Sequence, residues 1–110
     1  MSEITTIGLD LAKNTFHVVG CDARGKAIRR KMLKRAQVTA YFANLPACLV
    51  GMEACAGAHF WARQLRGLGH EVRLIPPQHV KAYVRGNKND YNDARAIAEA
   101  VRRPDMRFVA

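Results

Sequence analysis

The feature that most constrains the fold is a change in the spacing of apolar residues about one third of the way along the chain. The first third holds three segments rich in apolar and β-branched residues, joined by short turns. We predict strands over residues 4–10, 15–21 and 26–33, with Gly25 in the turn before the third. Short connections of this kind are typical of an antiparallel meander, and glycine tolerates the positive φ of a tight turn.

The remainder alternates between helical and strand patterns. A stripe of Ala58, Trp61, Ala62, Leu65 and Leu68 has helical spacing, and Gly69 suits the position just past that helix. A second stripe runs from Ala94 to Val101. The expected elements are helix 37–45, strand 48–52, helix 58–68, strand 71–75, short helix 78–84, helix 94–101, and a last strand or frayed end at 106–109.

The predicted order is therefore β-β-β-α-β-α-β-α. A meander followed by crossover units implies an α/β fold with a mixed sheet and helices on both faces. This is the element order of the RNase H-like (RuvC-like) fold, and also of one lobe of the actin-like ATPases. With 110 residues the chain has the length of one domain, residues 1–110, with one core.

The charge balance points to a polyanionic partner. Eighteen Lys and Arg oppose nine Asp and Glu, a net charge of +9, which favours nucleic acid over a membrane surface. The simpler alternative is a basic soluble protein without such a partner. No apolar run approaches the roughly 20 residues that span a bilayer and we see no signal peptide, so we expect a cytoplasmic protein, which the family resemblance described below would place in bacteria. We interpret the three cysteines as buried thiols.

Two acids lie at the ends of predicted strands. Asp10 ends the first strand and Glu53 follows the fourth. In the expected topology these strands are parallel neighbours about 4.8 Å apart, so both carboxylates could reach one cation. Open α/β sheets place their sites at such ends. Taken singly, Asp10 could be a turn residue and Glu53 a helix-dipole charge.

Two further acids precede the last helical stripe. Asp90 and Asp93 are three residues apart, which places both on one helix face, next to the buried stripe. Alone they could be a helix cap and a first-turn acid. Together with Asp10 and Glu53 they would repel one another unless a cation intervened. Oxygen ligands suit Mg²⁺ or Mn²⁺, and we expect two ions, which could assist a phosphodiester displacement.

Basic residues surround these acids. Residues 23–52 contain no Asp or Glu, and neither do residues 72–89. Bases that hold a nucleic acid backbone around acids that hold metal are what a phosphodiester enzyme needs, although a basic run can also be a solvated face. No arrangement of aromatic residues suggests base stacking, and Trp61 is expected in the core. The candidate nucleic-acid-binding residues are Lys13, Arg29, Arg30, Lys31, Lys34, Arg35, Lys81, Arg85 and Lys88.

Three motifs resemble one family. They are residues 7–16 (IGLDLAKNTF), 51–57 (GMEACAG) and 88–94 (KNDYNDA). The chain resembles bacterial insertion-sequence transposases with a RuvC-like Asp-Glu-Asp-Asp domain, a family that includes pilin-gene invertases and bridge-RNA-guided recombinases. The resemblance implies that Asp10, Glu53, Asp90 and Asp93 form the metal-binding catalytic tetrad. It also implies Mg²⁺ dependence, a homo-oligomeric synapse with DNA and, in some members, a structured guide RNA.

One departure from that family matters. Its members continue into a second domain that supplies a serine, proposed as the nucleophile, whereas the only serine here is Ser2. We therefore expect a DEDD catalytic domain without the serine-bearing domain, and incomplete recombination by this chain alone. The alternatives are a non-catalytic nucleic-acid-binding remnant, a RuvC-type junction resolvase and, less in keeping with the length, an actin-like ATPase lobe.

Overall fold

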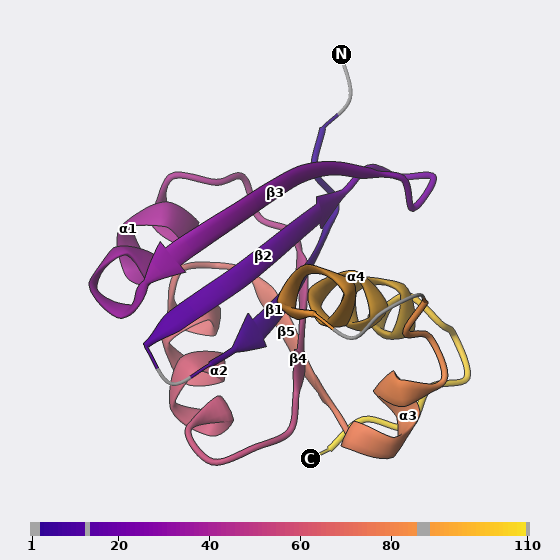
Figure 1. Ribbon diagram of the computed structural model, residues 1–110. Helices are drawn as coiled ribbons and strands as arrows, with labels where there is room; N and C mark the ends of the chain where they lie inside the picture. Colours follow the sequence, from indigo (N-terminus) through magenta and orange to yellow (C-terminus); the bar gives the residue numbers. More distant parts are fainter. Residues whose placement is uncertain (1–2, 13, 86–88, 110) are drawn as a thin grey trace.

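Five strands form one mixed sheet in the order β3-β2-β1-β4-β5. The computed structural model describes residues 3–12, 14–85 and 89–109, with only the backbone at residue 90. Figure 1 shows β1, β2 and β3 side by side, with α4 in front of the sheet and α1 and α2 behind it. The elements are β1 Thr6–Leu11, β2 Thr15–Cys21, β3 Ala27–Lys34, α1 Val38–Ala43, β4 Leu49–Glu53, α2 Ala58–Gly67, β5 Glu71–Ile75, α3 Pro77–Lys81 and α4 Asp90–Val101.

The meander forms as the sequence predicts. β2 pairs antiparallel with both β1 and β3. The carboxylate of Asp22 accepts the backbone N–H groups of Arg24 and Lys26, each at 3.0 Å. Gly25 follows with a φ of 86°, a conformation that is strained for residues with a Cβ. These contacts close the turn and fix the register of β3 against β2.

The crossover units add β4 and β5 parallel to β1. Leu9 of β1 lies opposite Met52 of β4, and Met52 lies opposite Leu74 of β5. The predicted order and the parallel pairing of β1 with β4 are both confirmed. The expected helix over residues 37–45 consists of a 3-10 turn followed by the shorter α1, and α3 is likewise shorter than expected. Of residues 106–109, only Val109 joins the sheet, through a single bridge to Leu74.

Side chains alternate between the two faces of the sheet, with one buried cluster behind it and two in front, under α4. Behind the sheet, α1 and α2 pack Phe42, Trp61 and Leu65 against Leu9 and Met52. Burial of these apolar surfaces is the main stabilising contribution to the layer. In front, the cores of α4 contain its residues Ala94, Ala96, Ile97, Ala98, Ala100 and Val101. The predictions of helices on both faces and of a core position for Trp61 are confirmed.

Close approach of α4 to the sheet depends on glycines. A Cβ at Gly8 would lie 2.6 Å from the backbone nitrogen of Ala98, and one at Gly51 would lie 2.7 Å from the Cβ of Val101. Such contacts require something to shift, so only glycine leaves room for α4 at this depth. The small residues of β1 and β4 therefore place α4 directly on the sheet.

One expectation about the cysteines is wrong. Cys21 and Cys48 are buried, but Cys55 is exposed, because it lies in the loop between β4 and α2 rather than on an inward face. His70 is structural: its Nε2 lies 2.8 Å from the carbonyl oxygen of Phe42, and its Nδ1 accepts the N–H of Cys48 at 3.2 Å. No helix in the described part of the chain is long and apolar enough to cross a membrane.

Candidate active site

The first two candidate acids lie side by side at the ends of parallel strands. The pairing of Leu9 with Met52 brings the next residues, Asp10 and Glu53, to the same edge of the sheet. The Cβ positions of Gly8 and Gly51 face α4. Because side chains on a strand alternate, Asp10 and Glu53, each two residues further on, face α4 as well.

The third acid comes from the start of α4. The side chain of Asn89 caps this helix by accepting the N–H of Asn92 at 2.8 Å, and the Asn89 carbonyl accepts the N–H of Asp93 at 2.9 Å. Asn89, and not either aspartate, is therefore the cap. Asp93 immediately precedes Ala94, which packs on Gly8. The glycine contact thus holds Asp93 above the end of β1.

These three acids line one cavity. Its volume is about 310 Å³, and its walls are Asp10, Glu53, Val80, Lys81, Val84 and Asp93. Each of the three carboxylates is partly exposed, so the cavity opens to solvent. Asp90 is the first residue of α4, but its side chain lies outside the described residues, as does the expectation that it shares a face with Asp93.

The negative charges of the acids affect the pKa of the nearby thiol of Cys55. Although the residue is exposed, partial burial of the sulfur is the main cause that raises the pKa of its thiol, and the charges of Glu53 and Asp10 raise it further. A negative potential at this edge is what a cation would neutralise. The donor set is made of carboxylate oxygens, which Mg²⁺ and Mn²⁺ prefer. Within the described residues, which exclude the side chain of Asp90, no three His, Cys, Asp or Glu side chains form a metal-binding group by themselves.

The candidate nucleic-acid-binding residues separate into groups. Strand alternation places Arg30 and Lys34 on the α4 face, opposite Val19 and Thr15, and Arg29 and Lys31 on the other face. The guanidinium carbon of Arg30 lies 6.0 Å from the centre of the Tyr91 ring of α4.

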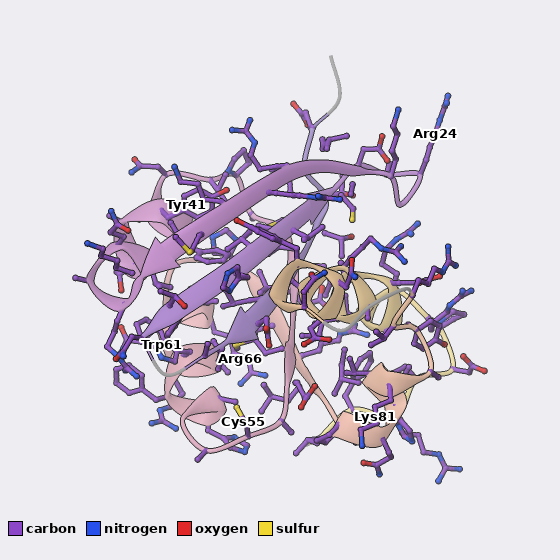
Figure 2. All side chains as sticks on the ribbon, in the orientation of Figure 1. Arg24, Tyr41, Cys55, Trp61, Arg66 and Lys81 are labelled. Atoms are coloured by element: carbon purple, nitrogen blue, oxygen red, sulfur yellow. The ribbon has the colours of Figure 1, made fainter. Side chains whose placement is uncertain are left out.

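Two further bases lie nearer to the helices. Lys81 borders the acidic cavity and is labelled on α3 in Figure 2. Arg35 lies over Phe16 and Trp61. Lys13 and Lys88 lie outside the described residues.

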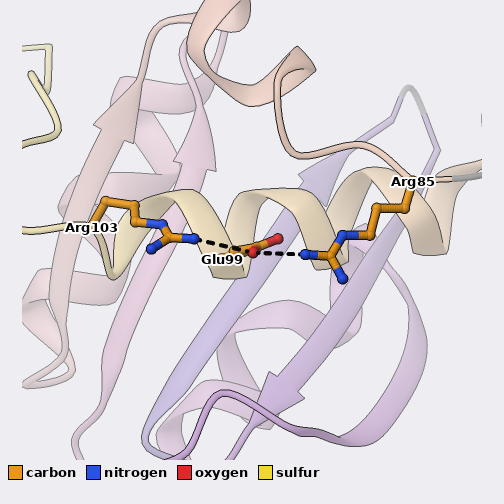
Figure 3. Close-up of polar contacts among 3 residues, drawn as sticks. All are labelled: Arg85, Glu99 and Arg103. Carbon is orange, nitrogen blue, oxygen red and sulfur yellow. Dashed lines mark hydrogen bonds and ion pairs between the residues drawn. The ribbon is translucent and has the colours of Figure 1, made fainter.

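Arg85 is an ion-pair partner rather than a free cation. Its Nη2 is 3.3 Å from Oε1 of Glu99, which also accepts from Arg103 at 3.4 Å (Figure 3). Glu99 lies on α4 and Arg85 follows α3, so the pair ties the segment between the two helices to α4. Because the Arg85 side chain is 70% exposed, this interaction is weak and easily exchanged.

The exposed ring of Phe60 is a surface feature that was not predicted from the sequence. Phe60 is 45% exposed, whereas the adjacent Trp61 is only 6% exposed. Successive residues on a helix point about 100° apart, so Phe60 leaves the buried stripe. The position of Phe60 next to the stripe indicates that its side chain is exposed. The helical pattern alone does not distinguish a solvated aromatic residue from one that lines a groove.

Comparison with solved structures defines the fold class. RuvC from Thermus thermophilus superposes with a TM-score of 0.69, covering 94% of this chain and 99% of the RuvC chain at 12% sequence identity. A second structure, T. thermophilus RuvC in complex with Holliday junction substrate, gives a TM-score of 0.62 over 89% of this chain and 92% of that one, also at 12% identity. The fold is therefore RuvC-like, within the RNase H-like class.

The family follows from sequence comparison. The family of DEDD transposases of IS110 elements matches residues 7–110, and the chain belongs to this family. It is 58% identical over 106 residues to a probable family 20 transposase of Pseudomonas aeruginosa, and 50% identical over 109 residues to the transposase for insertion sequence element IS1328 of Yersinia enterocolitica. These matches cover 96% and 99% of this chain but 31% and 33% of the relatives, so the chain spans about a third of their length.

Proposed function

We propose that this chain is the metal-dependent DNA cleavage and strand-transfer domain of an insertion-sequence transposase. The observation that carries the proposal is the cavity at the carboxyl ends of β1 and β4, where Asp10, Glu53 and Asp93 meet. Membership of the DEDD transposase family supports the same conclusion.

In this proposal Asp10, Glu53, Asp93 and Asp90 hold Mg²⁺ or Mn²⁺, as two ions. When bound, such ions polarise a phosphodiester and lower the pKa of a nucleophile, and a pair can stabilise both the attacking and the leaving oxygen. The four residues act as the catalytic ligands. The protein supplies their placement, through the register of β1 with β4 and the glycine contacts under α4.

The basic residues position the DNA. Lys81 borders the cavity, and Arg30 and Lys34 share the α4 face of the sheet with Asp10. Contacts of this kind hold phosphates and carry no sequence information. We therefore assign Lys81, Arg30 and Lys34 to backbone binding next to the cut. We assign a weaker contribution to Arg29 and Lys31, which lie on the other face.

The proposal for the whole-length protein extends further. We place the DEDD catalytic domain in residues 1–110 and the serine-bearing domain elsewhere in the longer relatives. A homo-oligomeric synapse with DNA, use of a structured guide RNA by some members, and action in the bacterial cytoplasm belong to that protein.

Thermal unfolding tests the metal site directly. We would compare the native chain with an Asp10→Asn, Asp93→Asn double variant, with and without millimolar Mg²⁺ or Mn²⁺. An Asp105→Asn, Glu71→Gln double variant is the matched control, since it makes the same change of charge at two exposed acids outside the cavity. Metal at tenfold its dissociation constant should stabilise the native chain and the control by about 1.4 kcal/mol, but not the cavity variant.

The metal-free measurement adds a second criterion. Without metal, the cavity variant should be more stable than the native chain, because repulsion among the carboxylates is relieved. If metal stabilises neither protein and the cavity variant gains nothing, the acids do not form one site. The chain would then be a nucleic-acid-binding remnant, and the basic surface alone would account for its function.

A further inference from the structure

A second hollow lies beside the acidic cavity, between the end of β1 and the start of α2. We call it the ring groove. It is bounded by residues of β1 and β2, of the loop after β4, and of α2, and its volume is about 460 Å³, within the range of roughly 300–1,000 Å³ typical of ligand sites. Its lining residues are Leu11, Ala12, Phe16, Arg35, Cys55, Ala56, Gly57, Phe60 and Trp61. Figure 2 labels Cys55 and Trp61 on the α2 side of the molecule.

Aromatic rings form one wall of the ring groove. Phe60 and Phe16 each pack edge-on against Trp61, with ring centroids 5.2 Å apart in both pairs. Trp61 and Phe16 are buried, so the accessible ring belongs to Phe60. A large apolar side chain left exposed in a hollow, and not on a convex surface, is characteristic of a binding site.

Among the described lining residues, Arg35 supplies a cation. The guanidinium carbon of Arg35 lies 5.7 Å from the centre of the Phe16 ring and 5.9 Å from that of Trp61. A planar guanidinium group beside aromatic rings can bind a planar, electron-rich ligand that carries a negative charge. A nucleotide has these properties: its base stacks on rings and guanidinium planes, and its phosphate is anionic.

The ring groove and the acidic cavity are neighbours along the chain. Leu11 follows Asp10, so the groove begins one residue, about 3.8 Å of chain, beyond the first carboxylate. Cys55, also in the groove, is two residues after Glu53. Because side chains alternate along β1, Asp10 faces α4 and Leu11 faces α2, so the two hollows lie on opposite sides of the same sheet edge. A strand that crosses this edge would present a phosphate to one hollow and a base to the other.

From this arrangement we infer that the ring groove binds one unpaired base of the DNA strand, next to the phosphate held at the acidic cavity. Phe60 supplies the stacking surface and Arg35 the cation that covers the base. This inference rests on the proposed function, since the strand is placed by the acidic cavity. It assigns a binding role to Phe60, which is not one of the metal ligands.

The test compares single-stranded DNA oligonucleotides of about 15 nucleotides with all-abasic oligonucleotides of the same length and charge, by fluorescence anisotropy. The native chain should bind the intact strand about 5- to 100-fold more tightly than the abasic strand, the range for one stacked base. Phe60→Ala should lose this preference and bind both strands as weakly as the native chain binds the abasic one. A 2-aminopurine base should be quenched by the native chain and not by Phe60→Ala.

Three further variants separate stacking from general effects. Phe60→Tyr keeps the ring and should keep the preference, whereas Phe60→Leu keeps apolar bulk without a flat face and should lose it even if Phe60→Ala fails to fold. Leu68→Ala is the matched control, because Leu68 is 36% exposed at the opposite end of α2. It should bind both strands as the native chain does.

The outcomes separate this inference from the proposed function. Equal binding of intact and abasic strands by the native chain would overturn the base site and leave phosphate binding intact. Binding of neither strand would overturn both DNA proposals, while the metal-dependent stability measured separately would still report on the acidic cavity. If Phe60→Ala instead dissociated a dimer of the native chain in sedimentation, the groove would be a contact between copies and the inference would be wrong.

Discussion

Gly8 of β1 and Ala98 of α4 pack backbone against backbone, so that a Cβ at Gly8 would lie 2.6 Å from the Ala98 nitrogen. The same glycine lies under Ala94, the residue after Asp93. The position of Asp93 on α4 therefore depends on the absence of a side chain at Gly8 of β1.

Replacing Gly8 by Ala should lower stability and displace α4. Overpacking a dense core costs about 1–3 kcal/mol, measured as the change in free energy of unfolding in urea. Metal should then stabilise the variant less than the native chain, because Asp93 moves with the helix. Gly67→Ala is the control: nothing lies within 4 Å of a Cβ there, and a helical Ala should stabilise by about 0.5–1 kcal/mol. A Gly8→Ala variant as stable as the native chain would contradict the close contact.

The two faces of β3 should contribute unequally to DNA binding. Arg30→Gln, Lys34→Gln removes two bases from the face that carries Asp10, and Arg29→Gln, Lys31→Gln removes two from the other face. For duplex DNA, the first pair should reduce the slope of log affinity against log salt by about 1.8, at roughly 0.9 for each phosphate contact. The second pair should change it less. Equal slopes for both variants would show that DNA does not distinguish the faces.

Glu99→Gln should strengthen DNA binding. Glu99 holds Arg85 and Arg103 by its Oε1, so its neutralisation releases both cations and removes a negative charge. For an ion pair as exposed as that of Arg85 with Glu99, the coupling energy should be about 0.2–1 kcal/mol. This corresponds to a change of roughly 1.4- to 5-fold in affinity for DNA. Titrations of Glu99→Gln, Arg85→Gln and the double variant measure this coupling. Additive effects would mean that the pair does not restrain Arg85.

Stability should fall above pH 9 because of Cys48. Burial raises the pKa of its thiol from 9.0 to about 11, so the unfolded chain loses this proton first as the pH rises. The contribution of the protonated Cys48 thiol to the free energy of unfolding is complete below pH 9. It is lost between about pH 9 and pH 11, at roughly 1.4 kcal/mol per pH unit. The difference in free energy of unfolding between the native chain and Cys48→Ala should shrink over this interval. A constant difference would contradict the raised pKa.

Much of the fold could be predicted because its signals are local. The strand Thr15–Cys21 and the stripe containing Trp61 each carry their own periodicity, and the order of β1, β2 and β3 follows from the short turns that join them. The edge location of Asp10 and Glu53 was predictable from the RNase H-like element order, in which β1 and β4 are parallel neighbours and so end together.

What could not be predicted depends on three-dimensional packing. The pairing of Arg85 with Glu99 joins residues 14 apart in the chain, and no periodicity marks it. Exposure of Cys55 and Phe60 depends on how the loop after β4 meets α2. The ring groove in particular requires Arg35 to lie over two rings from different elements. For this reason the sequence indicated no stacking site.

The acids of the cavity come from residues 10, 53 and 93, and so from the first strand, the middle of the chain and the last helix. During synthesis, a ribosome-bound chain that has not yet released α4 has two carboxylates at the sheet edge and no complete cavity. A fragment that ends between β4 and α4 is in the same position. In the proposed function, the metal site is therefore complete only when α4 has packed on the sheet.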